Sequence, residues 1–161
     1  MNTIRAFFRN FEEIVCAAMI TTMSLLVIAN VFLRYLFGYS ISWAEEVATI
    51  CFVWSVFIGA SAAYKHRLDI GIDTLVRKTS PRVQDGIRLL TGLGLVVLNG
   101  YVFYMALVFT SIAWPKPTAV LGVSSAVVNS ALIVGFGLIT LHSLRFVRRD
   151  LLAFLKLQQS A

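Results

Sequence analysis

The residues best able to do chemistry in this 161-residue chain lie between Asn30 and Glu46. A single cation, Arg34, is followed after a short turn by two adjacent carboxylates, Glu45 and Glu46. A cation beside carboxylates can relay protons or hold a cation, or it can simply close an ion-paired turn. We favour the ion-paired turn, because these charges lie at the ends of apolar stretches and not in their middle.

The turn itself carries signals of helix ends. Gly38 is typical of a helix C-terminus, and Arg34 in the preceding turn suits the negative end of the helix dipole. Ser42 and Glu45 have the spacing of a capping box, in which Glu45 would reach back to the amide of Ser42. The sequence therefore predicts a helical hairpin in which Arg34 pairs with Glu45 or Glu46.

Several enzyme classes are excluded by the residues available. A membrane haem protein usually needs facing pairs of histidines, and this chain has only His66 and His142. A thiol oxidoreductase needs a paired-cysteine motif, whereas Cys16 and Cys51 are isolated. The chain also lacks a phosphate-binding glycine loop, an H-E-x-x-H motif and a nucleophile elbow. We therefore predict no catalytic residue, no metal site and no cofactor in this chain.

These residues must be positioned by four long apolar stretches. Hydrophobic residues make up 58% of the chain and charged residues only 14%. About 20 apolar residues are needed to cross a bilayer as a helix, and the first stretch is too long for a removable signal peptide. The pattern predicts an all-α integral membrane protein, a single four-helix domain over residues 1–161. The expected spans are about 14–37, 43–64, 84–114 and 122–145.

The basic residues predict the orientation of these spans. Lys and Arg gather before the first span, between the second and third, and after the fourth, whereas the other two connections hold only Arg34 and Lys116. Because cytoplasmic loops are enriched in Lys and Arg, both termini are expected in the cytoplasm. Tyr35 and Trp43 then fall at the outer boundary as interfacial anchors. The net charge of +6 is explained by topology and does not indicate binding to nucleic acid.

The central connection predicts an additional helix. Apolar residues recur at helical spacing over residues 68–76, and Asp69 and Asp73 fall on the opposite face. This pattern is typical of an amphipathic helix in the cytoplasmic interface, which would contact either a partner or membrane lipid. Ser80 and Pro81 then resemble the cap and first turn of the third spanning helix.

Polar and small residues inside the spans have structural interpretations. Asn99 and Asn129 are more typical of packing, with hydrogen bonds to a neighbouring helix, than of ion coordination. Stripes of small residues at a spacing of four would let helices approach closely, either within this chain or against a partner. These stripes are Ser55, Gly59 and Ala63, and Ala131 and Gly135.

Three short motifs in order, N-x-x-x-R-Y, W-A-E-E and W-S-V-F-I-G-A, resemble the small membrane subunit of tripartite ATP-independent periplasmic (TRAP) transporters. The matching positions are Asn30, Arg34, Tyr35, Trp43, Glu45, Glu46, Trp54, Phe57, Gly59 and Ala60. The chain departs from the family pattern at Leu68, where a histidine is common. Together with Asp69 and Asp73, most of these residues are candidates for structural or interface roles.

The resemblance implies a bacterial inner-membrane system of three parts that imports an organic acid. A periplasmic binding protein captures the substrate, and a large membrane subunit moves it, usually with sodium. The present chain would then be a non-catalytic scaffold for the large subunit and a possible docking site for the binding protein.

Two other functions are compatible with four spans. An independent four-helix exporter would need an acidic residue inside a span, but Glu12, Glu13, Glu45 and Glu46 lie at span ends. The remaining alternative is a structural membrane assembly protein without a transport role.

Overall fold

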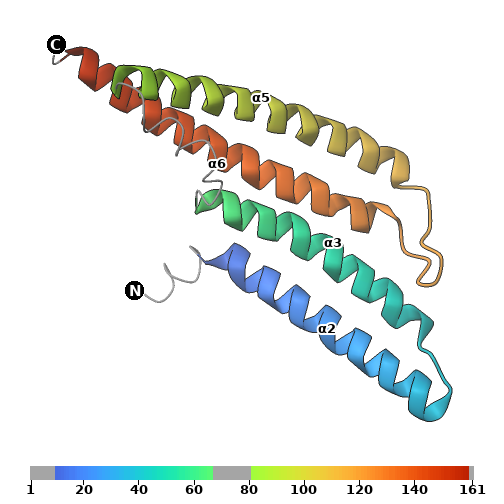
Figure 1. The fold of residues 1–161 in the computed structure, drawn as a ribbon. Helices are drawn as coiled ribbons and strands as arrows, with labels where there is room; N and C mark the ends of the chain where they lie inside the picture. The colour runs from blue at the N-terminus through green and yellow to red at the C-terminus, as the bar shows by residue number, and fades with distance from the viewer. Residues whose placement is uncertain (1–9, 67–80, 160–161) are drawn as a thin grey trace, which may run out of the picture.

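The computed structural model describes residues 10–66 and 81–159, and the regular elements in these ranges are all helices. They are α2 (Phe11–Phe37), α3 (Ser42–Lys65), α5 (Pro81–Ala113) and α6 (Ala126–Gln159), shown in Figure 1. Each helix contains a stretch long and apolar enough to cross a membrane. The predicted all-α architecture with four spanning helices is therefore confirmed.

The four helices form an open layer and not a closed bundle. α2 packs on α3, α3 on α6, and α6 on α5, so α2 and α5 lie at opposite edges of the layer. We call the end with the two short connections, residues 38–41 and 114–125, the loop end. The opposite end, near the chain termini, is the terminal end. The α5–α6 hairpin extends further than the α2–α3 hairpin at the terminal end (Figure 1).

The helix boundaries at the loop end follow from local chemistry. α2 ends before Gly38, which has φ 68° and donates its amide to the carbonyl of Arg34, as predicted for a left-handed C-terminal cap. The segment after α5 is not helical, because Thr118 donates its amide to the carbonyl of Val123 across a small turn. α6 consequently begins at Ala126, four positions after the predicted start at 122.

Small residues allow the central helices to approach closely. A Cβ atom added to Gly135 in α6 would lie only 2.7 Å from Cβ of Phe57 in α3. Ala131, one turn earlier, is fully buried. On the other side of α3, a Cβ atom at Gly59 would lie 3.1 Å from Sγ of Cys16. Both stripes thus pack helices of this chain together, which answers the question that the sequence left open.

The structure places Asn99 and the start of α5, two features that the sequence analysis singled out. Asn99 is buried, but its side-chain amide donates to the carbonyl of Leu95 in its own helix at 2.8 Å. The expectation that this amide would bond to a neighbouring helix is wrong, because the preceding turn already offers a nearby acceptor. The start of α5 at Pro81 is as predicted, whereas the proposed interfacial helix with Asp69 and Asp73 lies outside the described residues.

Candidate functional site

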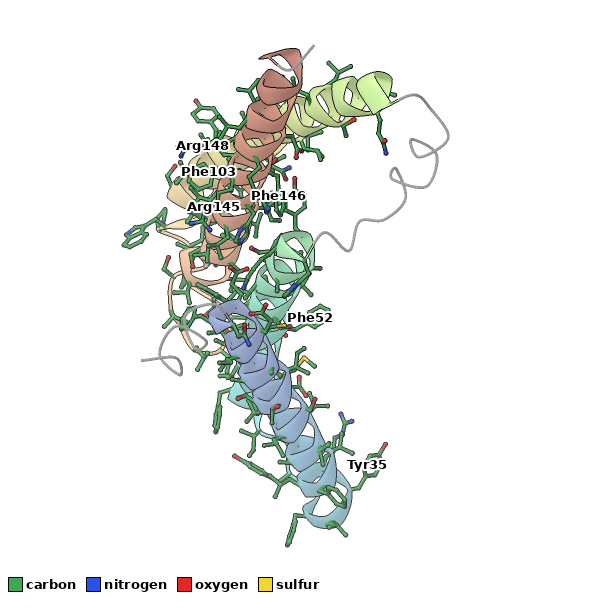
Figure 2. The ribbon with its side chains drawn as sticks, turned by 90° about the vertical axis from the view of Figure 1, so that its left-hand side faces the viewer. Tyr35, Phe52, Phe103, Arg145, Phe146 and Arg148 are labelled. Carbon is green, nitrogen blue, oxygen red and sulfur yellow. The ribbon has the colours of Figure 1, made fainter. Side chains whose placement is uncertain are left out.

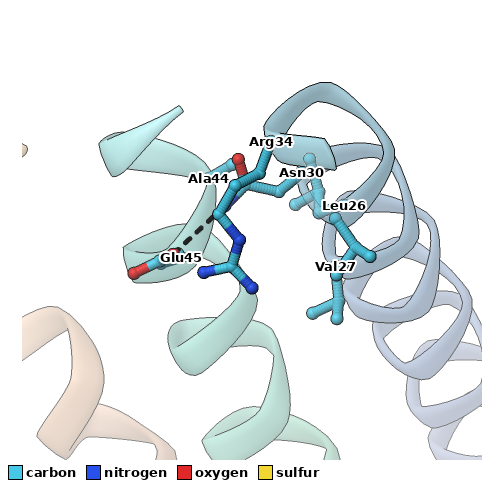
Figure 3. A pocket seen from close by; sticks show the side chains of 7 residues that line it. Leu26, Val27, Asn30, Arg34, Ala44 and Glu45 are labelled. Carbon is cyan, nitrogen blue, oxygen red and sulfur yellow. Dashed lines mark hydrogen bonds between the residues drawn. The ribbon is translucent and has the colours of Figure 1, made fainter. Parts of the chain in front are cut away.

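The side chain of Asn30 joins the two helices of the first hairpin. It is 8% exposed, and its Oδ1 accepts a hydrogen bond from the amide of Ile41 at 2.7 Å. Its Nδ2 donates to Oε1 of Glu45 at 3.2 Å (Figure 3). One asparagine therefore holds both the turn and the first turn of α3 against α2.

The predicted capping box at the start of α3 is wrong. The N-cap residue is Ile41, which makes no side-chain cap, and Ser42 is the first helical residue. Glu45 does not reach back to an amide of its own helix, because its carboxylate accepts from Asn30 on α2. The same asparagine accepts from the Ile41 amide, so a side chain from the preceding helix replaces the local cap.

The predicted ion pair of Arg34 is also wrong. In residues 10–66 and 81–159, no carboxylate lies within ion-pair distance of Arg34, and its guanidinium lies 5.7 Å from the ring centroid of Tyr35. The two expected partners are engaged elsewhere. Glu45 accepts from Asn30, and Oε2 of Glu46 accepts from the amides of Val120 and Leu121.

A small pocket lies between α2 and α3 at the loop end, with a volume of about 140 Å³. Figure 3 shows the Arg34 side chain directed back along α2 into this space, with Glu45 on the facing helix. Side chains on helices point toward the N-terminus of the helix, which explains this direction. The pocket therefore combines one cation, one carboxylate, one amide and an apolar wall. Its lining residues are Leu26, Val27, Asn30, Val31, Arg34, Ala44 and Glu45.

Glu46 and Trp54 tie the first hairpin to the second. The two backbone amides bound by Glu46 lie 2.9 and 3.0 Å from its Oε2 and belong to the α5–α6 connection. About two helical turns further along α3, Nε1 of Trp54 donates to the carbonyl of Val127 at 3.1 Å. Both residues of the candidate set thus position the α5–α6 hairpin against α3.

The aromatic residues of the candidate set are exposed at the loop end. Tyr35 is 79% exposed and Trp43 is 49% exposed, and Figure 2 shows Tyr35 projecting from the end of α2. Amphipathic rings favour the boundary between lipid and water. Their placement fits interfacial anchoring, as the sequence predicts.

A polar cluster at the terminal end is absent from the sequence-based candidates. Oε1 of Glu12 on α2 lies 3.0 Å from Nε2 of His142 on α6. Oε2 of the same carboxylate accepts a hydrogen bond from Oγ of Ser61 on α3 at 2.9 Å. Glu12 and His142 are only 12% and 10% exposed, and Ser61 is fully buried. One carboxylate therefore links three helices.

Further polar contacts surround this cluster. Glu13 lies 3.1 Å from Nζ of Lys65 and 2.7 Å from Nε2 of His66, and Tyr64 donates to the hydroxyl of Ser143 at 3.0 Å. Two features of the sequence could have indicated this cluster: a histidine inside an apolar stretch, His142, and two glutamates at the start of a span, Glu12 and Glu13. In the described part of the chain, no group of three or more His, Cys, Asp or Glu is arranged to hold a metal ion.

The chain matches the family model described as "Tripartite ATP-independent periplasmic transporters, DctQ component" over residues 23–153. A putative TRAP transporter small permease protein of Haemophilus influenzae is 32% identical over 97 residues, which are 60% of this chain and 60% of that protein. The "C4-dicarboxylate TRAP transporter small permease protein DctQ" of Vibrio cholerae is 38% identical over 78 residues, 48% of this chain and 34% of that protein. The chain thus covers less than two thirds of the length of these relatives.

Proposed function

The chain belongs to the DctQ-component family of TRAP transporters, and we propose that it acts as the scaffold of such a transporter. It is a multi-pass membrane protein and a non-catalytic small permease component. In this proposal it binds the large membrane subunit, holds it in position and carries no substrate site of its own.

The open layer is the observation that carries this proposal. Four helices side by side bury few large side chains against each other and leave apolar faces on α2 and α5. The described carboxylates gather at the two ends of the layer, where Glu12, Glu45 and Glu46 join helices, whereas the buried amide of Asn99 bonds to its own helix. A transport site near the bilayer midplane usually requires a polar or broken-helix centre, so a supporting role fits this arrangement better than independent export.

The partners and cargo follow from the family and from one relative. We propose that the large subunit moves an organic acid with a sodium gradient, and the C4-dicarboxylate name of the Vibrio relative supports this substrate class. Val120, Leu121 and Val123 are exposed at the loop end, where Glu46 holds their segment in place. This surface is suited to contact the periplasmic binding protein.

Reconstitution tests the division of labour. Proteoliposomes with the large subunit, this chain and the binding protein should take up substrate under a sodium gradient, and omission of this chain should abolish uptake. The binding protein should still bind its ligand normally. Uptake by this chain alone, under a sodium or proton gradient, would contradict the proposal.

The proposed location is the bacterial inner membrane with both termini in the cytoplasm, which the distribution of Lys and Arg supports. Single cysteines in a background without the two native cysteines can test it with an impermeant thiol reagent on intact cells. Positions in the short connections should react and positions near the central connection and C-terminus should not; the reverse pattern would invert the orientation. Suitable positions are Ser40 and Thr118 for the first group and Thr79 and Ser160 for the second.

A further inference from the structure

We propose that the pocket between α2 and α3 at the loop end binds the headgroup of a phospholipid that carries a primary ammonium. The lipid phosphate would lie at the guanidinium of Arg34 and its ammonium at the carboxylate of Glu45. The acyl chains would follow the exposed apolar surface of α2.

The positive charge of Arg34 favours an anion in this pocket. Its side chain points back along α2 into the space between the helices (Figure 3), toward a wall formed by Val27 and Val31. No carboxylate in the described ranges forms an ion pair with it. Arg34 is exposed at the end of a spanning helix, where lipid phosphates lie within reach of a cation, and a guanidinium matches the geometry of phosphate oxygens.

The carboxylate in the same pocket indicates that the ligand also carries a positive charge. Oε1 of Glu45 accepts from Asn30, whereas Oε2 has no hydrogen-bond partner among residues 10–66 and 81–159. A purely anionic ligand would place like charges together in this pocket. A zwitterionic headgroup with separate phosphate and ammonium groups complements Arg34 and Glu45 at once.

The position and size of the pocket favour a lipid. Tyr35 and Trp43, both exposed, mark this end of the layer as the headgroup level. A volume of about 140 Å³ is well below the roughly 300–1,000 Å³ of pockets that enclose a whole small molecule. It can hold a headgroup, while Val27, Val31 and Phe32 on α2 are exposed for contact with acyl chains.

Native mass spectrometry of the full chain tests the binding. The chain is released from nanodiscs that contain equal amounts of phosphatidylethanolamine, phosphatidylglycerol and phosphatidylcholine, and the retained lipids are counted. Arg34→Gln should weaken retention of phosphatidylethanolamine about tenfold, and Arg34→Lys should retain part of it. Arg148→Gln, which removes an exposed arginine far from the pocket, should leave retention unchanged. Circular dichroism confirms that each variant is folded.

The preference between headgroups tests the role of Glu45. Glu45→Gln keeps an oxygen for Asn30 but removes the charge, so the preference for phosphatidylethanolamine over phosphatidylglycerol should disappear. Equal loss of phosphatidylethanolamine in the Arg34→Gln and Arg148→Gln variants, or no loss in either, would overturn the proposal. The proposal would also be overturned if the Arg34→Gln variant kept its lipid but no longer bound the large subunit. The anion bound by Arg34 would then be a side chain of that subunit.

Discussion

Replacing Glu12 with alanine should destabilise the chain far more than replacing its neighbour Glu13. Both residues lie in the first turn of α2 and both contact a histidine. A comparison of the two alanine variants therefore tests the effect of burial. Glu12 and His142 are 12% and 10% exposed, whereas Glu13 and His66 are 32% and 54% exposed. The same chemical change is thus made in a buried and in an exposed setting.

The expected magnitudes differ because the partners left behind differ. Removal of Glu12 leaves His142 and the hydroxyl of Ser61 shielded and without their acceptor, and each buried polar group left unsatisfied in this way costs about 1–3 kcal/mol. Removal of Glu13 leaves His66, which is 54% exposed, and Lys65, which is 19% exposed but has a long chain that can turn its ammonium outward. The loss should therefore stay near the value of exposed pairs, about 0–1 kcal/mol. We expect a difference of about 3 kcal/mol between the two variants.

Unfolding in mild detergent, followed by far-UV circular dichroism, measures this difference. The double variant with Glu12→Ala and His142→Ala should lose less than the sum of its single variants, because the second change removes the group that the first left unpaired. Equal losses for Glu12→Ala and Glu13→Ala would refute the reasoning, as would additivity in the double variant. The cluster would then be an incidental contact and not a link between helices.

Three other changes test the remaining contacts by the same unfolding measurement. Gly135→Ala should cost about 1–3 kcal/mol because its Cβ would meet the backbone of Phe57, whereas Gly94→Ala, with nothing within 4 Å, should cost nothing. Trp54→Phe should lose about 0.5–1.5 kcal/mol with its one hydrogen bond, and no loss would show that bond to be dispensable. Asn30→Ala removes two hydrogen bonds at once and should destabilise more than Trp54→Phe; the opposite order would contradict its bridging role.

The helices could be predicted from the sequence because their signals are local. Apolar length predicts the four spans, and Gly38 and Pro81 mark a helix end and a helix start that the structure reproduces. The start of α6 was predicted too early, because residues 118–125 are apolar enough to continue a span. Their cross-turn hydrogen bonds, such as that from Thr118 to Val123, depend on how the chain folds back and leave no periodic signal.

The candidate site was predicted in composition but not in pairing. Asn30, Glu45 and Glu46 all make contacts that join segments of the chain, but opposite charge suggested Arg34 as the partner of Glu45 or Glu46. The register of the hairpin places Asn30, one turn before Arg34, beside Glu45, and it places Glu46 beside the α5–α6 connection. Glu12 and His142 are 130 positions apart, so their contact depends on the packing of α2, α3 and α6, which no local pattern encodes.

Polar contacts and small residues both hold the helices of the layer together. Helices in lipid gain little from burying apolar surface, so close packing and interhelical hydrogen bonds must supply the association. The close contact between Gly135 and Phe57 joins the two hairpins in the middle of the layer, while Glu46 joins them at the loop end and Glu12 at the terminal end. Two hairpins fixed at three levels cannot rotate or slide freely past each other. An open layer braced in this way presents its outer apolar faces in a constant relative position, and the scaffold role proposed above would require such a surface.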